Sequence, residues 1–187
     1  MNRCSWCNLN NKKYVEYHDN EWGKINFEDK YLFEMLILES FQAGLSWECV
    51  LNKRDSFRIC YDNFDIDKVI LYDENKINEL LNNKDIIRNK LKILSSINNA
   101  KIFKRIVLEY KSFYNYLCTF TNGKIFYETN LTKSNLSDAI SLDLTKRGMK
   151  FVGSTIIYSY LQAIGIINSH EKSCYLYEEI NDIKCKW

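Results

Sequence analysis

The stretch that decides the expected fold is Lys146-Arg147-Gly148-Met149-Lys150-Phe151-Val152-Gly153-Ser154. A helical pattern over Ser137–Arg147 stops at Gly148, and a second over Ser154–Ile164 stops at Gly165. Glycine ends a helix without strain because it adopts φ > 0. Two helices joined by a short turn with glycine at each end form a tight hairpin. The stretch therefore predicts a helical hairpin in the last third of the chain.

The turn of this predicted hairpin is suited to an anion. Gly153 precedes a helix, so backbone N–H groups there stay free, and with the helix dipole they suit a phosphate oxygen. Lys146, Arg147 and Lys150 lie at the same place in the sequence. The alternative is an ordinary turn between two helices with a solvated basic rim, and the pattern alone favours that alternative slightly.

Outward from the hairpin, the sequence predicts an all-α fold. The absence of proline and the presence of only 6 glycines suit long helices and disfavour tight β-turns. Residues 1–27 are expected to be irregular, and 121–133 are the least regular part of the rest. Apolar spacing and capping residues predict helices from Asp29 to a stop at Gly44 and over 46–61, 67–72, 74–81, 85–110 and 112–120.

Length and charge narrow the class of protein. The chain has 187 residues and a mass of 22.3 kDa, which fits one domain. No run of about 18 apolar residues is present, so a membrane-spanning helix is not expected. The N-terminus has no apolar core and thus no visible signal peptide, and we expect a cytoplasmic protein. Because the net charge is only +2, any contact with nucleic acid must come from a local basic patch.

Cysteine and histidine residues lie near both ends of the chain. His170 precedes Cys174 by four residues, which predicts that both lie on one face of a helical turn, and His18 follows Cys4 by fourteen. Together they form a Cys₂His₂ set suited to tetrahedral Zn²⁺. The alternatives are four unrelated residues with cysteines buried as small hydrophobes, or a ligand or redox pair formed by Cys4 and Cys7.

Glu39 is the first candidate for chemistry. It follows Leu32, Met35 and Leu36 at helical spacing and so falls in an apolar stripe. A carboxylate there is costly unless it has a partner, which makes Glu39 a candidate acid, base or hydrogen-bond acceptor in a pocket. The alternative is that the helix rolls slightly and Glu39 reaches solvent.

Aromatic residues interleaved with polar ones form the second candidate: Trp6, Tyr14, Tyr17, Trp22 and Trp47. They could stack on a flat heterocycle, an interaction worth about 1–3 kcal/mol per base. The alternative is that these rings pack the core, which is the usual place of a tryptophan.

Four short strings carry a resemblance to a known family. They are Tyr17-His18-Asp19-Asn20-Glu21-Trp22-Gly23, Gln42-Ala43-Gly44-Leu45-Ser46-Trp47, Ile86-Ile87-Arg88-Asn89, and Lys146-Arg147-Gly148 with Lys150-Phe151-Val152-Gly153. The sequence resembles the bacterial DNA-3-methyladenine glycosylase I family from Cys4 to Cys174. The resemblance implies a single glycosylase domain over 1–187 with the helix-hairpin-helix DNA glycosylase fold. In it, a zinc-clamped terminal region (1–27 and 165–187) joins a helical body (28–164) that carries the hairpin at 148–153.

The resemblance also implies the roles of individual residues. One structural zinc per chain would be held by Cys4, His18, His170 and Cys174. The damaged base would be held by the catalytic residues Glu39, Tyr17 and Trp47, surrounded by Tyr14, Trp22 and Trp6. The DNA contacts would come from Gly148, Lys150, Val152, Gly153 and Ser154.

The implied reaction is hydrolytic excision of 3-methyladenine from double-stranded alkylated DNA, without strand cleavage, by a cytoplasmic monomer that does not contact a membrane. Two departures from the family are Cys7, which could compete as a ligand, and Ser169, where the family carries Asp. The family lacks the catalytic Asp of its hairpin relatives, and residues 166–170 here contain no acid. The alternatives are a non-catalytic DNA-binding module and a zinc-stapled helical interaction domain.

Overall fold

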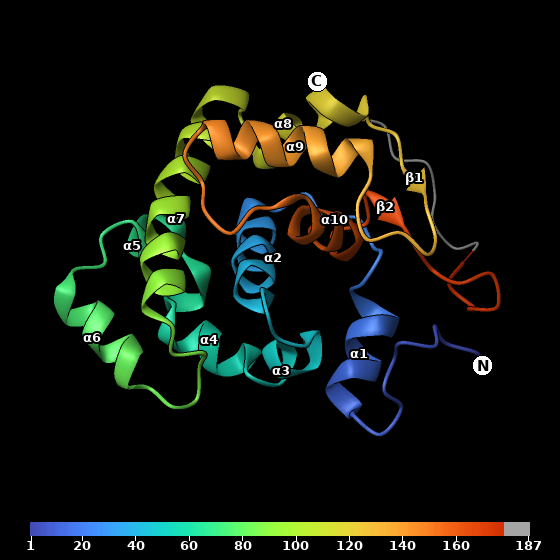
Figure 1. Cartoon of the computed structure of the whole chain (residues 1–187), viewed down its shortest axis with the longest axis horizontal. Helices are drawn as coiled ribbons and strands as arrows, with labels where there is room; N and C mark the ends of the chain where they lie inside the picture. Colours follow the sequence, from blue (N-terminus) through green and yellow to red (C-terminus); the bar gives the residue numbers. More distant parts are fainter. Residues whose placement is uncertain (178–187) are drawn as a thin grey trace.

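The structure, a computed structural model, describes residues 1–177 as a mainly helical molecule with one very small sheet (Figure 1). Its helices are α1 (Lys12–Asn20), α2 (Asp29–Gln42), α3 (Trp47–Asn52), α4 (Arg54–Cys60), η1 (Asp62–Phe64), α5 (Ile66–Val69), α6 (Glu74–Asn82), α7 (Lys90–Tyr110), α8 (Phe113–Thr121), α9 (Asn135–Lys146) and α10 (Ser154–Ala163). Strands β1 (Phe126–Tyr127) and β2 (Ile167–Asn168) pair in parallel. The prediction of a mainly helical fold is confirmed, and within residues 1–177 the two short strands are the one departure from all-α. The sequence did not indicate them, because two-residue strands are too short to show alternation.

The core forms around α2, which lies at the centre of the molecule with α7 on one side and α10 on the other. Ten consecutive residues, from Leu32 to Phe41, are buried. The helix is therefore enclosed on every side rather than along one stripe. Rolling α2 could not bring Glu39 to solvent, so its burial follows from the position of the whole helix.

The observed helix boundaries differ from the predicted ones by a few residues in several places, and most at two of them. The expected helix over 85–110 begins only at Lys90, because the Asn83 side chain accepts from Asp85 N at 2.9 Å and holds a local turn instead. The expected helix over 46–61 is divided at Lys53 (φ −98°, ψ −1°) into α3 and α4.

The N-terminal region contains a helix that the sequence pattern did not indicate. Asn11 caps α1, because its side chain accepts from the backbone N–H groups of Lys13 and Tyr14. Only Tyr17 and His18 of its nine residues are buried, so the helix contributes a small apolar face to the core. The expectation that residues 1–27 are irregular was wrong for this segment.

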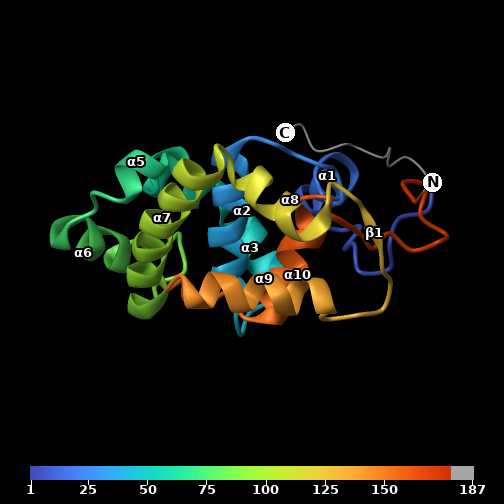
Figure 2. The same ribbon diagram turned by 90° about the horizontal axis from the view of Figure 1, so that it is seen from above.

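The predicted hairpin is present, with α9 and α10 packed against each other (Figure 2). Gly148 has φ +99° and ends α9, where Gly148 N donates to Thr145 O and Met149 N to Leu144 O. From α7, the Asn99 amide donates to Lys150 O at 2.8 Å and accepts from Lys150 N at 2.9 Å. The turn is thus held by a third helix.

The beginning of the chain lies against its C-terminal part. Tyr175 N donates to Asn2 O at 3.0 Å. At Gly165, a Cβ atom would lie 2.5 Å from Ile25 N, so only glycine permits this crossing. The N-terminal segment is therefore in contact with the segment that follows β2. Residues 178–187 of the expected terminal region lie outside the described residues. In the described part, no helix is both long and apolar enough to span a bilayer.

Candidate functional site

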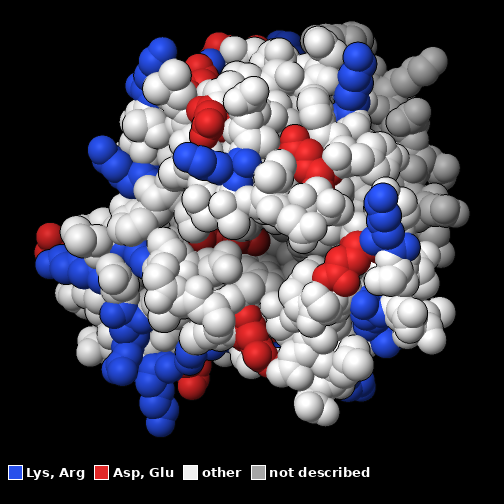
Figure 3. All heavy atoms as spheres, turned by 45° about the vertical axis from the view of Figure 1, so that its right-hand side comes forward, with Lys and Arg blue, Asp and Glu red and all other residues white. Residues whose placement is uncertain are grey.

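A cavity of about 240 Å³ opens between α1, the C-terminal end of α2, the start of α3 and α10. Figure 3 shows this side of the molecule hollowed near its centre, with acidic side chains beside the hollow. The structure brings all six expected pocket residues to its wall: Trp6, Tyr14, Tyr17, Trp22, Glu39 and Trp47.

Glu39 is a buried carboxylate with an unused acceptor. Its exposed fraction is 3%, so the alternative in which it reaches solvent is wrong. Burial raises the pKa of Glu39 to about 8. Within the described part of the chain, its Oε2 has no hydrogen-bond partner, a situation that costs about 1–3 kcal/mol. The cavity therefore presents an acceptor for a donor that is not part of the protein.

Trp47 and Tyr17 form the neighbouring wall. Their ring centroids lie 5.3 Å apart at a tilt of 45°. Tyr17 is buried, and burial raises its pKa well above the ordinary value, so its hydroxyl stays protonated and can donate. Trp47 is half-buried, and no described group accepts from its Nε1. Trp47 also lines the cavity, so part of its ring is available for stacking.

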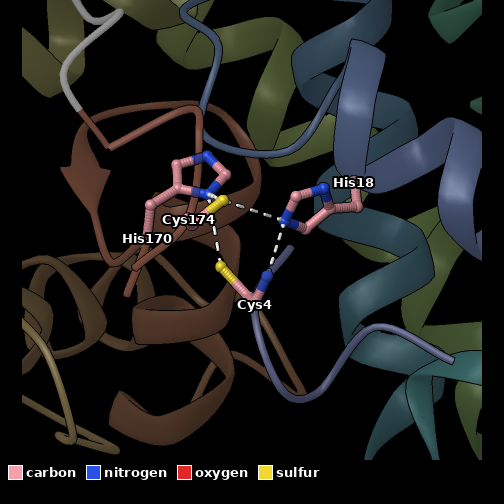
Figure 4. A group of neighbouring side chains, drawn as sticks. All are labelled: Cys4, His18, His170 and Cys174. Atoms are coloured by element: carbon pink, nitrogen blue, oxygen red, sulfur yellow. Dashed lines mark hydrogen bonds between the residues drawn. The ribbon is translucent and has the colours of Figure 1, made fainter. Parts of the chain in front are cut away.

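Four residues form a buried cluster next to this wall, shown in Figure 4. The ligand atoms of Cys4, His18, His170 and Cys174 all lie within 4.8 Å of one another. Cys174 Sγ is 3.5 Å from both His18 Nε2 and His170 Nδ1, and Cys4 Sγ is 3.4 Å from His170 Nδ1. Such a Cys₂His₂ set can bind a metal ion.

The local structure behind this cluster differs from the expectation. His170 and Cys174 do not share a helical turn but lie in the irregular segment that follows β2. Cys7 lies outside the cluster, with its Sγ 3.8 Å from Tyr14 O. The four side chains are thus gathered by tertiary contacts between the N-terminal segment and the segment after β2.

Hydrogen bonds fix the orientation of His18. Its Nδ1 lies 2.8 Å from Asp19 Oδ1, and Arg3 donates to both oxygens of that carboxylate at 2.7 Å. The Arg3 guanidinium holds the pKa of Asp19 well below its ordinary value. A proton on Nδ1 leaves the lone pair of Nε2 directed at the cluster, which is the usual arrangement of a ligating histidine.

The cluster and the cavity share aromatic contacts. Trp22 packs edge-on against His170 with centroids 4.6 Å apart, and Trp6 lies 5.3 Å from His18. Trp6 and Trp22 themselves are 4.7 Å apart. One wall of the cavity therefore rests directly on the two imidazoles.

The expected DNA-contact residues lie at the hairpin in different states of exposure. Lys150 and Gly153 are exposed and Gly148 is half-buried. Val152 is 2% exposed, backbone included, and its carbonyl oxygen accepts from the Ser141 hydroxyl at 2.7 Å. The Ser154 hydroxyl is 2.9 Å from that of Ser137 on α9.

Arg147 does not belong to the free basic rim that the sequence suggested. Its guanidinium bonds Asp143 and Glu109, each at 2.7 Å, and lies over the Tyr110 ring. Of the cationic side chains near the turn, Lys146 and Lys150 remain exposed.

Polar residues that sequence reasoning did not select complete the cavity wall: Gln42, Thr129, Asn130, Ser159, Gln162, Ser169 and Glu171. Two of them had a detectable signal. Ser159 and Gln162 are polar at i and i+3 in the mainly apolar part of α10 that follows its first turn. Thr129 and Asn130 come from an irregular loop, which periodicity does not describe.

Comparisons with known proteins agree with one another. The family model described as methyladenine glycosylase matches residues 6–177. DNA-3-methyladenine glycosylase 1 of Escherichia coli (strain K12) is 40% identical over 183 residues, which cover 95% of this chain and 97% of the relative. DNA-3-methyladenine glycosylase of Haemophilus influenzae (strain ATCC 51907 / DSM 11121 / KW20 / Rd) is 34% identical, with coverages of 92% and 96%.

The fold comparison points the same way. A structure reported for the recognition of 3-methyladenine by 3-methyladenine DNA glycosylase I from Staphylococcus aureus matches with a TM-score of 0.90 and 30% identity. The match covers 97% of this chain and 99% of that one.

Proposed function

We propose, because this chain belongs to the methyladenine glycosylase family, that it removes 3-methyladenine from alkylated double-stranded DNA by hydrolysis of the glycosidic bond. The chain is a DNA glycosylase by family. The finer proposal is that it leaves an abasic site without strand cleavage and acts as a monomer with one glycosylase domain. The observation that supports removal of 3-methyladenine is the pair formed by Glu39 and Trp47. Both line one cavity, and within the described residues Glu39 Oε2 has no hydrogen-bond partner.

Two kinds of interaction would recognise the base, namely stacking on an aromatic ring and attraction between opposite charges. A purine methylated at a ring nitrogen carries positive charge in DNA, so it gains from the electron-rich face of Trp47. The Glu39 carboxylate accepts from the polar edge of the base, and the Tyr17 hydroxyl lies on the same wall. The cation also favours the ionised form of Glu39, which burial disfavours in the free protein.

The chemical step needs little activation. The glycosidic bond of the cationic nucleotide is already weak because the base leaves as a neutral molecule. The protein then has to select, extrude and orient the nucleotide while water completes hydrolysis, and extrusion costs a few kcal/mol. No lysine nucleophile is required, which is why strand cleavage is not expected.

The hairpin supplies the contact to the duplex in this proposal. The N-terminus of α10 has no side-chain cap, and Gly153 is exposed there. Its free N–H groups can donate to a phosphate oxygen, with Lys150 beside them. The buried Val152, which accepts from Ser141, would support this turn from inside, together with Ser154 and Gly148.

The metal in the cluster would be zinc. Zinc bonds of about 2.0–2.3 Å in a tetrahedron set ligand atoms roughly 3.3–3.8 Å apart. Three of the six separations in the cluster, all between Sγ and N, are 3.4, 3.5 and 3.5 Å, and all six are within 4.8 Å. The donor set therefore fits. Four protein ligands leave no open position, so the ion would act structurally and would support the wall that contains Trp6 and Trp22.

The proposal is tested by incubating the purified protein with methylated duplex DNA and identifying the released base by chromatography. We expect 3-methyladenine and intact strands, and we expect no release by Glu39→Ala or Trp47→Ala variants that remain folded. Release at the parental rate by either variant would contradict the pocket assignment. A parent protein that binds the duplex but releases nothing would instead be a DNA-binding module, and one without salt-dependent duplex affinity would be an interaction domain.

A further inference from the structure

Lys92, in the first turn of α7, is a buried cation that the proposed function does not use. Its exposed fraction is 7%. Its Nζ donates to Phe41 O at 2.8 Å and to Ala43 O at 2.6 Å. Burial lowers the pKa of Lys92 from its ordinary value. An ammonium group that is desolvated in this way is retained only where its hydrogen bonds are good.

The two acceptors lie at the C-terminal end of α2. The last carbonyls of a helix lack intrahelical partners and carry the negative end of the helix dipole. Ala43, the C-cap, has left the helical conformation (φ −46°, ψ 114°). Lys92 therefore holds both the last turn of α2 and the residue where the chain departs from it.

The departing segment connects two walls of the cavity. Residues 43–46 join Gln42 to Trp47, and both of these line the cavity. Gly44, Leu45 and Ser46 are exposed, and Gly44 has φ +79° with no atom within 4 Å of the place where a Cβ would lie. The segment is held locally by the turn in which Leu45 N donates to Gln42 O at 2.6 Å and by Ser46, whose hydroxyl accepts from Cys49 N at 3.2 Å and caps α3. Its middle, at Gly44 and Leu45, has little packing of its own.

The string Ile86-Ile87-Arg88-Asn89, which the base-binding chemistry does not involve, sets the position of Lys92. Asn89 caps α7, because its side chain accepts from Lys92 N at 3.1 Å. Ile86 is 2% exposed and fixes the preceding segment in the core. The start of α7 is therefore fixed at the residue that lets Lys92 reach α2.

We propose that Lys92 is a positioning residue for base excision, which keeps the 43–46 segment in place so that Trp47 stays at the cavity. The proposal rests on the proposed function. Lys92 acts through the backbone, because the acceptors of its Nζ are the carbonyl oxygens of Phe41 and Ala43.

The test compares Lys92→Met with Lys104→Met, the same substitution in the same helix at a side chain that pairs with Asp67. We expect Lys92→Met to lower the single-turnover rate of base release at saturating methylated DNA at least tenfold, with KM for that DNA changed less than threefold. Amide hydrogen exchange should rise at least tenfold in peptides covering 41–47 and stay unchanged around α9 and α10. Lys104→Met should change neither quantity, and Lys92→Arg should recover at least a third of the rate.

Three outcomes separate the possibilities. A Lys92→Met variant with a lowered melting temperature but the parental rate and parental exchange at 41–47 overturns the proposal, because Lys92 would then only stabilise the fold. If Lys92→Met does not fold, Lys92→Gln provides the same comparison. If the parent releases no base, the proposed function fails, while the exchange at 41–47 still decides whether Lys92 holds the segment.

Discussion

At the scale of single residues, Glu39 shows how burial prepares a recognition group. Its carboxylate is enclosed because the whole of α2 is enclosed, and within the described residues Oε2 lacks a partner. Native proteins keep few such groups, and a catalytic or binding role is one of the reasons for keeping one. The cost in the free protein is therefore consistent with a site that is completed by a cationic base.

This cost predicts a pH-dependent stability difference for Glu39→Gln. The pKa of Glu39 rises from 4.5 to about 8 on folding. Between these values the unfolded chain ionises first, so the parent loses stability as pH rises from 4.5 toward 8. We expect the variant to be more stable than the parent by up to a few kcal/mol at pH 8, at roughly 1.4 kcal/mol per unit of pKa, and nearly equal at pH 4.5.

Denaturant unfolding of both proteins across this pH range measures the difference. The comparison removes the titration of all other groups, since they are shared. A difference that does not change with pH would mean that Glu39 is not a buried carboxyl in solution.

At the scale of elements, the hairpin between α9 and α10 combines two glycines with different tasks. Gly148 has φ +99° and is required by the backbone. Gly153 has φ −60° and no atom within 4 Å of an added Cβ, so the fold does not require glycine there. A close approach of the DNA backbone is a reason for glycine at 153 that the isolated chain does not contain.

We therefore expect opposite results for two alanine substitutions. Gly153→Ala should leave stability unchanged or raise it by about 0.4–1 kcal/mol, while it weakens duplex affinity by tenfold or more. Gly148→Ala should destabilise the protein by about 1 kcal/mol or more because of its positive φ. Melting temperatures and fluorescence anisotropy with a labelled duplex check both. Unchanged duplex affinity of Gly153→Ala would remove the hairpin N-terminus from the interface.

The elements also show what a sequence pattern can and cannot predict. The hairpin, α2 and the helices capped by Asp73 and Ser112 follow from local signals, namely glycine stops and capping side chains. Helix α1 has only two buried residues and was missed, and the start of α7 depends on a side-chain turn at Asn83. Strands β1 and β2 exist only because distant segments meet, which no local pattern contains.

At the scale of the whole molecule, the chain is closed by its terminal regions. Cys4 and His18 meet His170 and Cys174 only after folding, and the Cys₂His₂ composition predicted the set while the assumed helical turn was wrong. The polar loop residues of the cavity could not be predicted, because Thr129 and Asn130 reach it only through the packing of their loop against the other elements.

Removal of the proposed zinc should therefore lower the stability of the protein and disturb the cavity wall that contains Trp6 and Trp22. We expect about one zinc per chain by elemental analysis. We expect a chelator, or Cys174→Ser, to lower the melting temperature by several degrees and to weaken base binding, because Trp6 and Trp22 pack on the two imidazoles. A metal-free protein with an unchanged melting temperature would contradict the structural role of the cluster.

Joint recognition of a methylated purine by Glu39 and Trp47 is best tested by calorimetric titration of free 3-methyladenine into the parent, Glu39→Gln and Trp47→Ala. We expect measurable binding to the parent and a loss of at least tenfold in Trp47→Ala, since stacking is worth about 1–3 kcal/mol. We expect a comparable loss in Glu39→Gln. Tyr127→Ala, at a ring that is 55% exposed and outside the cavity, should bind like the parent. Parental affinity in Trp47→Ala or Glu39→Gln would contradict this assignment of the base site.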